Sequence, residues 1–217
     1  MRRAFHALRN GAPGPVVIEL ISDVCNQNIS EKAQNYTSPR LTKQMPEPLE
    51  IEATADALLA SQTPMIWAGA GVLFSGSSDA LKELSQLTSI PVFCTMPGKS
   101  GFDERDPLSL GSGCGTTTQM AHEWLKCSDV ILALGSSLTR SPYAQAIPKG
   151  KILIQNTNNP DDINKDEPIQ INLVGDTKLT IENLIRVIKK KTQNNGFGEL
   201  EKTASKIKGI KESWLAK

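Results

Sequence analysis

The 217-residue sequence predicts an α/β fold, a doubly wound parallel sheet of about six strands with helices on both faces. Short apolar runs alternate along the chain with segments whose apolar residues recur every third or fourth position. The run at 129–135, Asp-Val-Ile-Leu-Ala-Leu-Gly, has no polar alternation, which is typical of a strand buried on both faces. Repeated alternation of such strands with helices favours a parallel sheet, whose ligands bind beyond the carboxyl ends of its strands.

The middle of the chain supplies these elements one after another. Helices are expected where leucines and isoleucines are spaced along one stripe, and strands where apolar residues follow one another between turn residues. The expected elements are a helix at 49–61, a strand at 64–68, a helix at 78–88, a strand at 90–95, a helix at 116–127, strands at 129–135, 151–155 and 169–174, and a helix at 178–190.

Both ends of the sequence look separate from this middle part. A helix at 1–10 and a strand at 15–20 cannot bury their apolar faces by themselves, so residues 1–28 are expected to be the tail of another domain. Residues 29–48 are polar and proline-containing, which indicates a linker before a central domain at 49–191. Residues 192–217 are expected to be a flexible break and an amphipathic helix at 199–214, with no partner in the central domain and leading toward a further one.

Composition excludes several classes of protein. The 24 basic and 23 acidic residues give a net charge of +1, which provides no field favouring nucleic acid or an anionic membrane. The four cysteines form no C-x-x-C pair, and this argues against a zinc site. No apolar stretch has the length of a membrane span and no signal peptide is present, so the expected location is the cytoplasm.

Three glycine-rich turns are candidate ligand contacts. Gly69-Ala-Gly71 follows a strand and precedes a helix, but Phe74 stands where the dinucleotide fingerprint requires glycine. The segment 110–116, Leu-Gly-Ser-Gly-Cys-Gly-Thr, comes just before a helix, and Gly135-Ser136 ends a buried strand. Each turn is either an anion site or only a tight connection. Their expected position on one sheet edge favours a shared ligand site.

No residue is predicted to be catalytic and none to bind a metal. Gly98-Lys99-Ser100 resembles the end of a P-loop, but Phe93 replaces its leading glycine. There is no G-x-S-x-G motif, and the two histidines, His6 and His122, lie in expected helices. The acidic pairs at 161–162 and 166–167 are interpreted as solvated turn residues.

The ordered series of motifs resembles the thiamine-diphosphate enzymes of the acetolactate synthase group. Residues 5–24, FHALRNGAPGPVVIELISDV, look like the end of that family's N-terminal pyrimidine-binding domain. PVFCTMPGKSGF at 91–102, DPLSLG at 106–111, SDVILALGS at 128–136 and VGD at 174–176 are similar to later blocks in the same order. The resemblance spans nearly the whole chain.

This resemblance implies a Rossmann-like central domain that binds FAD in some family members, ADP in others and nothing in the rest. The implied nucleotide-binding positions are Gly69, Gly71, Gly111, Gly115, Thr116, Gly135, Ser136, Asn156, Asn158 and Asp176. Flavin-binding members often have H-I-D-I-D-P where this chain has Gln-Asn-Thr-Asn-Asn-Pro at 155–160, a departure that puts flavin binding in doubt.

The resemblance also implies a parent enzyme that uses thiamine diphosphate and Mg²⁺, acts on 2-oxo acids as a transferase or lyase, and forms dimers or tetramers. The family's catalytic glutamate and its G-D-G…N motif have no counterpart here, so the chain is expected to be a structural or nucleotide-binding domain that needs catalytic domains as partners. The alternative is a stand-alone nucleotide-binding or regulatory module. A sirtuin-like deacylase is disfavoured because the C-x-x-C zinc module is missing.

Overall fold

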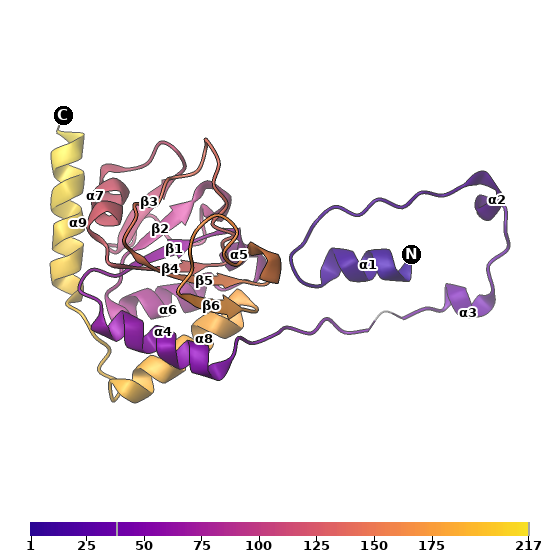
Figure 1. Ribbon diagram of the computed structural model, residues 1–217, viewed down its shortest axis with the longest axis horizontal. Helices are drawn as coiled ribbons and strands as arrows, with labels where there is room; N and C mark the ends of the chain where they lie inside the picture. The colour runs from indigo at the N-terminus through magenta and orange to yellow at the C-terminus, as the bar shows by residue number, and fades with distance from the viewer. Residues whose placement is uncertain (38, 217) are drawn as a thin grey trace. The chain divides into compact units, whose positions relative to one another are not determined.

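The chain comprises two compact units, Met1–Lys43 and Gln44–Lys217. The computed structural model describes residues 1–37 and 39–216 (Figure 1). The first unit contains three short helices, α1 (Arg2–Arg9), α2 (Ser22–Cys25) and α3 (Glu31–Gln34). Helix α1 confirms the helix predicted at 1–10. The strand predicted at 15–20 is wrong, because those residues have no ladder partner and Val17 is 87% exposed.

The second unit is built on a six-stranded sheet with the strand order β3-β2-β1-β4-β5-β6. Every neighbouring pair is parallel, which confirms the predicted doubly wound fold. The strands are β1 (Met65–Ala68), β2 (Val92–Thr95), β3 (Ser109–Gly113), β4 (Val130–Leu134), β5 (Ile152–Thr157) and β6 (Ile171–Val174). The order reverses between β1 and β4, and this is the position where open α/β sheets bind ligands.

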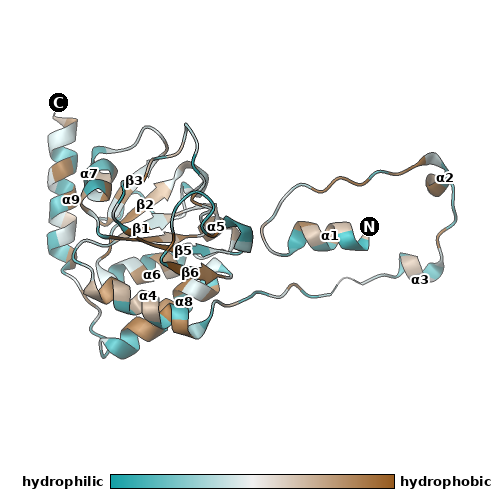
Figure 2. Cartoon of the chain, viewed as in Figure 1, coloured by the Kyte–Doolittle hydropathy of each residue, from teal (hydrophilic) through white to brown (hydrophobic). Residues whose placement is uncertain are grey.

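Helices cover both faces of the sheet, and each face has its own apolar core. One face is covered by α4 (Pro48–Ala60), α5 (Ala70–Phe74), α6 (Ser78–Thr88) and α8 (Thr177–Lys191), and the other by α7 (Gln119–Cys127) and α9 (Leu200–Leu215) (Figure 1). In Figure 2, α8 and α9 are banded brown and teal, as expected of helices with one apolar side. Among the residues described, no helix is both long and apolar enough to cross a membrane.

Helix α9 corrects the prediction that residues 199–214 have no partner in the central domain. Ile207 is only 4% exposed and belongs to the apolar core that α7 covers. The connection from α8 is fixed as well, because the Phe197 amide donates to the Leu87 carbonyl at the end of α6. The amphipathic stripe of this helix therefore covers part of the sheet's own core.

One strand and one α-helix of the second unit were not predicted. Strand β3 is a sheet edge of sequence Ser-Leu-Gly-Ser-Gly, and its register against β2 shifts between Val92 and Phe93. Helix α5 is five residues long and contains Gly71. Two 3₁₀ turns, η1 (Met96–Gly98) and η2 (Pro160–Asp162), follow β2 and β5. Glycine-rich sequence lowers the propensity for strand and helix alike, so neither β3 nor α5 has a periodic signal.

Candidate functional site

The predicted glycine turns at 69–71 and 135–136 meet where the strand order reverses. The Gly69 amide donates to the Leu134 carbonyl, and the Gly71 amide donates to the Gly135 carbonyl, both at 2.9 Å. A Cβ atom on Gly71 would lie 2.6 Å from the Gly135 Cα, closer than any side chain tolerates. Gly135 itself has a φ of +59°, a left-handed conformation that favours glycine. These glycines let two backbones touch.

Asn156 joins this pair of turns to the next strands. Its Oδ1 accepts from the Gly135 amide at 3.2 Å, and its backbone carbonyl accepts from the Ser136 amide at 3.2 Å. Its Nδ2 lies within hydrogen-bond distance of the Leu173 carbonyl, the Gly175 carbonyl and the Thr180 hydroxyl, at 2.8 to 3.1 Å. The side chain is fully buried. Its amide group is therefore engaged by protein atoms on both sides.

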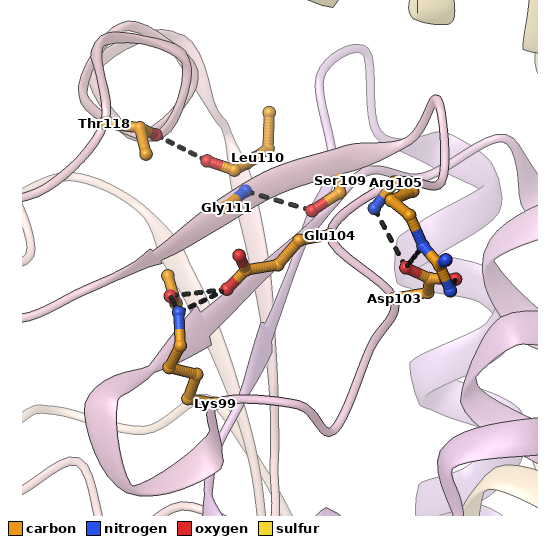
Figure 3. Close-up of polar contacts among 9 residues, drawn as sticks. Lys99, Asp103, Glu104, Arg105, Ser109, Leu110, Gly111 and Thr118 are labelled. Carbon is orange, nitrogen blue, oxygen red and sulfur yellow. Dashed lines mark hydrogen bonds and ion pairs between the residues drawn. The ribbon is translucent and has the colours of Figure 1, made fainter.

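The third predicted turn, 110–116, begins within the edge strand β3 and continues beyond it (Figure 3). Thr118 caps α7 by accepting from the Ala121 amide, and its hydroxyl also donates to the Leu110 carbonyl. The Gly111 amide donates to the Ser109 hydroxyl at 3.1 Å, and the Gly115 amide to the Tyr143 carbonyl at 2.8 Å. This turn is thereby attached to the loop that follows β4.

The remaining predicted positions lie at the ends of β5 and β6. Asp176 caps α8 by accepting from the Leu179 amide, and its own amide donates to the Gln44 carbonyl at 2.9 Å. Asn158 is exposed. The structure thus brings Gly69, Gly71, Gly135, Ser136 and Asn156 into one hydrogen-bonded group. Gly111, Gly115 and Thr116 belong to the β3 turn, on the same carboxyl edge of the sheet.

A polar cluster near β3 was not predicted. Lys99 Nζ lies 2.9 Å from Glu104 Oε1 and 3.1 Å from the Ser112 hydroxyl, which donates to the same carboxylate at 2.7 Å (Figure 3). Hydrogen bonds from Lys99 and then Ser112 lower the pKa of Glu104. The only sequence signal was Gly98-Lys99-Ser100, which fails as a P-loop.

Two hollows flank the sheet. The larger, about 550 Å³, lies between the start of α6 and the loop at 99–105, where Lys82, Asp79 and the Asp103–Arg105 ion pair line it. The smaller, about 310 Å³, is lined at the opposite edge by Pro64, Pro91, Trp124 and the start of α9. There Lys206 Nζ lies 4.6 Å from the centroid of the Trp124 ring. Both are open hollows with exposed charged side chains.

Groups able to perform acid–base or nucleophilic chemistry are scattered. His122 is exposed on α7. Burial raises the pKa of the Cys94 thiol to about 11, whereas a hydrogen bond from the Thr116 backbone lowers that of Cys114. Within residues 1–37 and 39–216, no three His, Cys, Asp or Glu side chains gather as metal ligands do. The described residues therefore offer no assembled catalytic or metal centre.

Three buried polar atoms have no hydrogen-bond partner among the described residues: Trp67 Nε1, Thr117 Oγ1 and Gln155 Oε1. Gln155 Nε2 does have partners, because it donates to the carbonyls of Ser136 and Asp162 at 3.1 and 3.3 Å. Trp67 and Gln155 flank Ala133 across β1, β4 and β5 on the face that α7 covers. All three are side-chain atoms and not backbone amides of the glycine turns.

The chain is similar to known proteins over this whole unit. A family model described as "Thiamine pyrophosphate enzyme, central domain" matches residues 51–184. A probable acetolactate synthase large subunit of Methanocaldococcus jannaschii is 32% identical over 86% of this chain and 33% of its own length. The acetolactate synthase isozyme 3 large subunit of Escherichia coli is 24% identical over all of this chain and 38% of its own length.

Solved structures show the same fold. The benzoylformate decarboxylase of Polynucleobacter necessarius superposes with a TM-score of 0.62 at 20% identity, covering 81% of this chain and 34% of that one. The chain thus spans between 33% and 38% of the length of the curated relatives described above.

Proposed function

The chain belongs to the family of thiamine pyrophosphate enzyme central domains, and from that premise we propose that it is the scaffold domain of an enzyme that acts on 2-oxo acids. The observation that supports this most is the extent of the family match, 51–184, which begins in α4 and ends in α8. It therefore spans all six strands of the sheet. The relatives named as acetolactate synthases support a transferase or lyase that joins or cleaves carbon bonds.

The described residues do not fit the ligands of thiamine diphosphate or its Mg²⁺. The cofactor stabilises a carbanion when bound, and Mg²⁺ requires several oxygen ligands at one place. The carboxylates at the carboxyl edge are engaged elsewhere: Asp176 caps α8, and Glu104 pairs with Lys99. We propose that other domains hold the cofactor and the metal, and that this unit fixes those domains relative to each other.

Residues 1–28 are proposed to pack on a domain other than the sheet. The supporting observation is their exposure, because several apolar residues of this segment lack burial in the first unit. They include Phe5, Val17, Leu20, Ile21 and Val24. Three further expectations stay predictions. They are that residues 192–217 lead toward a further domain, that the parent enzyme is a dimer or tetramer, and that it is located in the cytoplasm.

FAD or ADP at the carboxyl edge is implied by the resemblance alone, and the residues do not present the expected pyrophosphate cradle. Such a cradle requires free backbone amides. The amides of the candidate turns donate to protein acceptors instead, as those of Gly71, Gly115 and Gly135 do. The alternative of a stand-alone nucleotide-binding module gains no support from this geometry.

A domain exchange tests the scaffold proposal. Residues 44–217 would replace the matching segment of the Methanocaldococcus jannaschii relative, and formation of acetolactate and uptake of thiamine diphosphate would be measured. We expect the chimera to bind the cofactor and retain activity, whereas the 217-residue chain alone has neither. The relative with its central segment deleted is the control. A folded chimera with no more cofactor binding than that control would contradict the proposal.

A further inference from the structure

We infer that the carboxyl edge of this sheet is closed by the chain's own hydrogen bonds and binds no FAD or ADP, in contrast to the nucleotide site that the resemblance implies. The inference rests on the proposed function only for the family assignment, and not for catalytic activity. Three observations support it: the backbone contact at the strand reversal, the hydrogen bonds that the amides of the edge turns donate within the chain, and the bonds of Asn156.

The strand order of the sheet reverses between β1 and β4. In an open α/β sheet a dinucleotide lies in the crevice that forms there. In this chain the two turns occupy it themselves, since the Gly71 amide donates to the Gly135 carbonyl and the two residues touch backbone to backbone. A phosphate that replaced this contact would have to separate the two turns.

The backbone amides of the edge turns already have acceptors within the chain. A diphosphate is bound chiefly by backbone amides at a helix start or in a glycine turn. Here the backbone amides of seven of the ten implied positions donate to oxygen atoms of the chain at 2.8 to 3.2 Å. They belong to Gly69, Gly71, Gly111, Gly115, Gly135, Ser136 and Asp176. Each bond would have to be exchanged for a bond to the ligand, so binding gains little net free energy.

Asn156 stands where the flavin-binding motif has its first isoleucine. An isoleucine cannot hold the Gly135 amide, whereas Asn156 accepts from it and donates toward β6 and α8. Since the side chain is fully buried, these bonds are not in competition with water. Asn156 therefore fixes the turn after β4 to β5, β6 and α8.

The acidic positions of the same motif are changed too. Thr157 and Asn159 stand where flavin-binding members have aspartates, the residue type that accepts from ribose hydroxyls. Both bond to Asp162 instead, from Thr157 Oγ1 at 2.9 Å and from Asn159 Nδ2 at 3.4 Å. The loop after β5 is thus organised around its own carboxylate.

The first experiment titrates the 217-residue chain with FAD and with ADP, each at 1 mM, and records the melting temperature and the visible spectrum. A nucleotide at a hundredfold excess over its dissociation constant would raise the melting temperature by about 5–10 °C. We expect no shift and no flavin absorbance in the purified protein.

Hydrogen exchange locates any binding that does occur. A shift accompanied by new protection of the amides at 111–116 and 135–137 would overturn the inference. A shift that leaves those amides unchanged places the nucleotide elsewhere and upholds the closed edge. Neither result bears on the scaffold proposal, which the domain exchange tests. The closed edge and the scaffold role can therefore fail separately.

The second experiment tests Asn156 directly, by the substitution Asn156→Ala with Asp161→Ala as control, since Asp161 is exposed in the loop after β5. We expect exchange of the Gly135 amide to accelerate at least tenfold in Asn156→Ala and to stay unchanged in the control. Thr180→Val removes only one of the Asn156 partners and provides a milder variant if Asn156→Ala does not fold. Unchanged Gly135 exchange in a folded Asn156→Ala protein would refute the role of Asn156.

Discussion

Asp129 organises the edge of the sheet opposite the glycine turns. Its carboxylate accepts from the Ser61 hydroxyl and from the amides of Gln62 and Thr63, and so fixes the loop between α4 and β1 to the start of β4. Burial by itself would raise the pKa of this carboxyl group, but the hydrogen bonds outweigh it and lower the pKa from 3.8 to about 2. The folded state therefore favours the ionised form.

The substitution Asp129→Asn is expected to lower the free energy of unfolding at pH 7 by about 1–2 kcal/mol. A lowered folded-state pKa contributes stability above the unfolded value near 4, and this contribution is lost as the pH falls toward 2. Urea unfolding between pH 7 and pH 2 should show the two proteins converging. Asp161→Asn, in an exposed turn, is the control and should change little. A difference that persisted at pH 2 would contradict this account.

Residue types predicted the edge turns but not what the glycines contact. Gly69, Gly71 and Gly135 were singled out because glycine permits close approach, and the structure shows close approach of one backbone to another. A single sequence cannot separate these two uses, since both require only the absence of Cβ. The bonds of Asn156 were equally invisible, because Leu173 and Thr180 are distant in the sequence.

Among the elements, α9 makes the most direct stability prediction. Ile207→Ala should lower the free energy of unfolding by about 2–4 kcal/mol, since it removes a buried side chain from the core that α7 covers. Leu215→Ala is the matched control, because Leu215 lies at the end of the same helix and is 71% exposed. It should change the free energy of unfolding by no more than about 0.5 kcal/mol. Equal effects in urea unfolding would show that α9 does not pack as described.

Periodic elements were predictable from the sequence, and elements defined by their neighbours were not. Helix α6 has the predicted bounds, and β4 lies within the predicted run, because their apolar patterns are long or unbroken. Strand β3 exists because β2 offers it a ladder, which a Ser-Leu-Gly-Ser-Gly sequence does not reveal. Residues 15–20 show the reverse case: their side chains favour a strand, but no described strand pairs with them, and they form none.

For the whole molecule, the division at Lys43/Gln44 predicts where the folded unit begins. The Gln44 carbonyl accepts from the Asp176 amide, and Pro46 is buried against Gly175. A chain of residues 44–217 should melt within about 2 °C of the full chain, and one of residues 47–217 about 3–6 °C lower, as expected for a loss of roughly 1–2 kcal/mol. Calorimetry on the pair tests this. Equal melting temperatures would mean that residues 44–46 contribute nothing.

The strand order has a consequence for the sequence of events in folding. Strands β1 to β3 are consecutive neighbours, as are β4 to β6, so each half of the sheet can assemble from contacts between adjacent segments. Within the sheet, the two halves are joined by the pairing of β1 with β4, where Met65 pairs with Ile131. Closing that longer loop costs more chain entropy than closing the loops within either half. The contact between Gly71 and Gly135 is therefore expected to form late in folding, after each half of the sheet has nucleated.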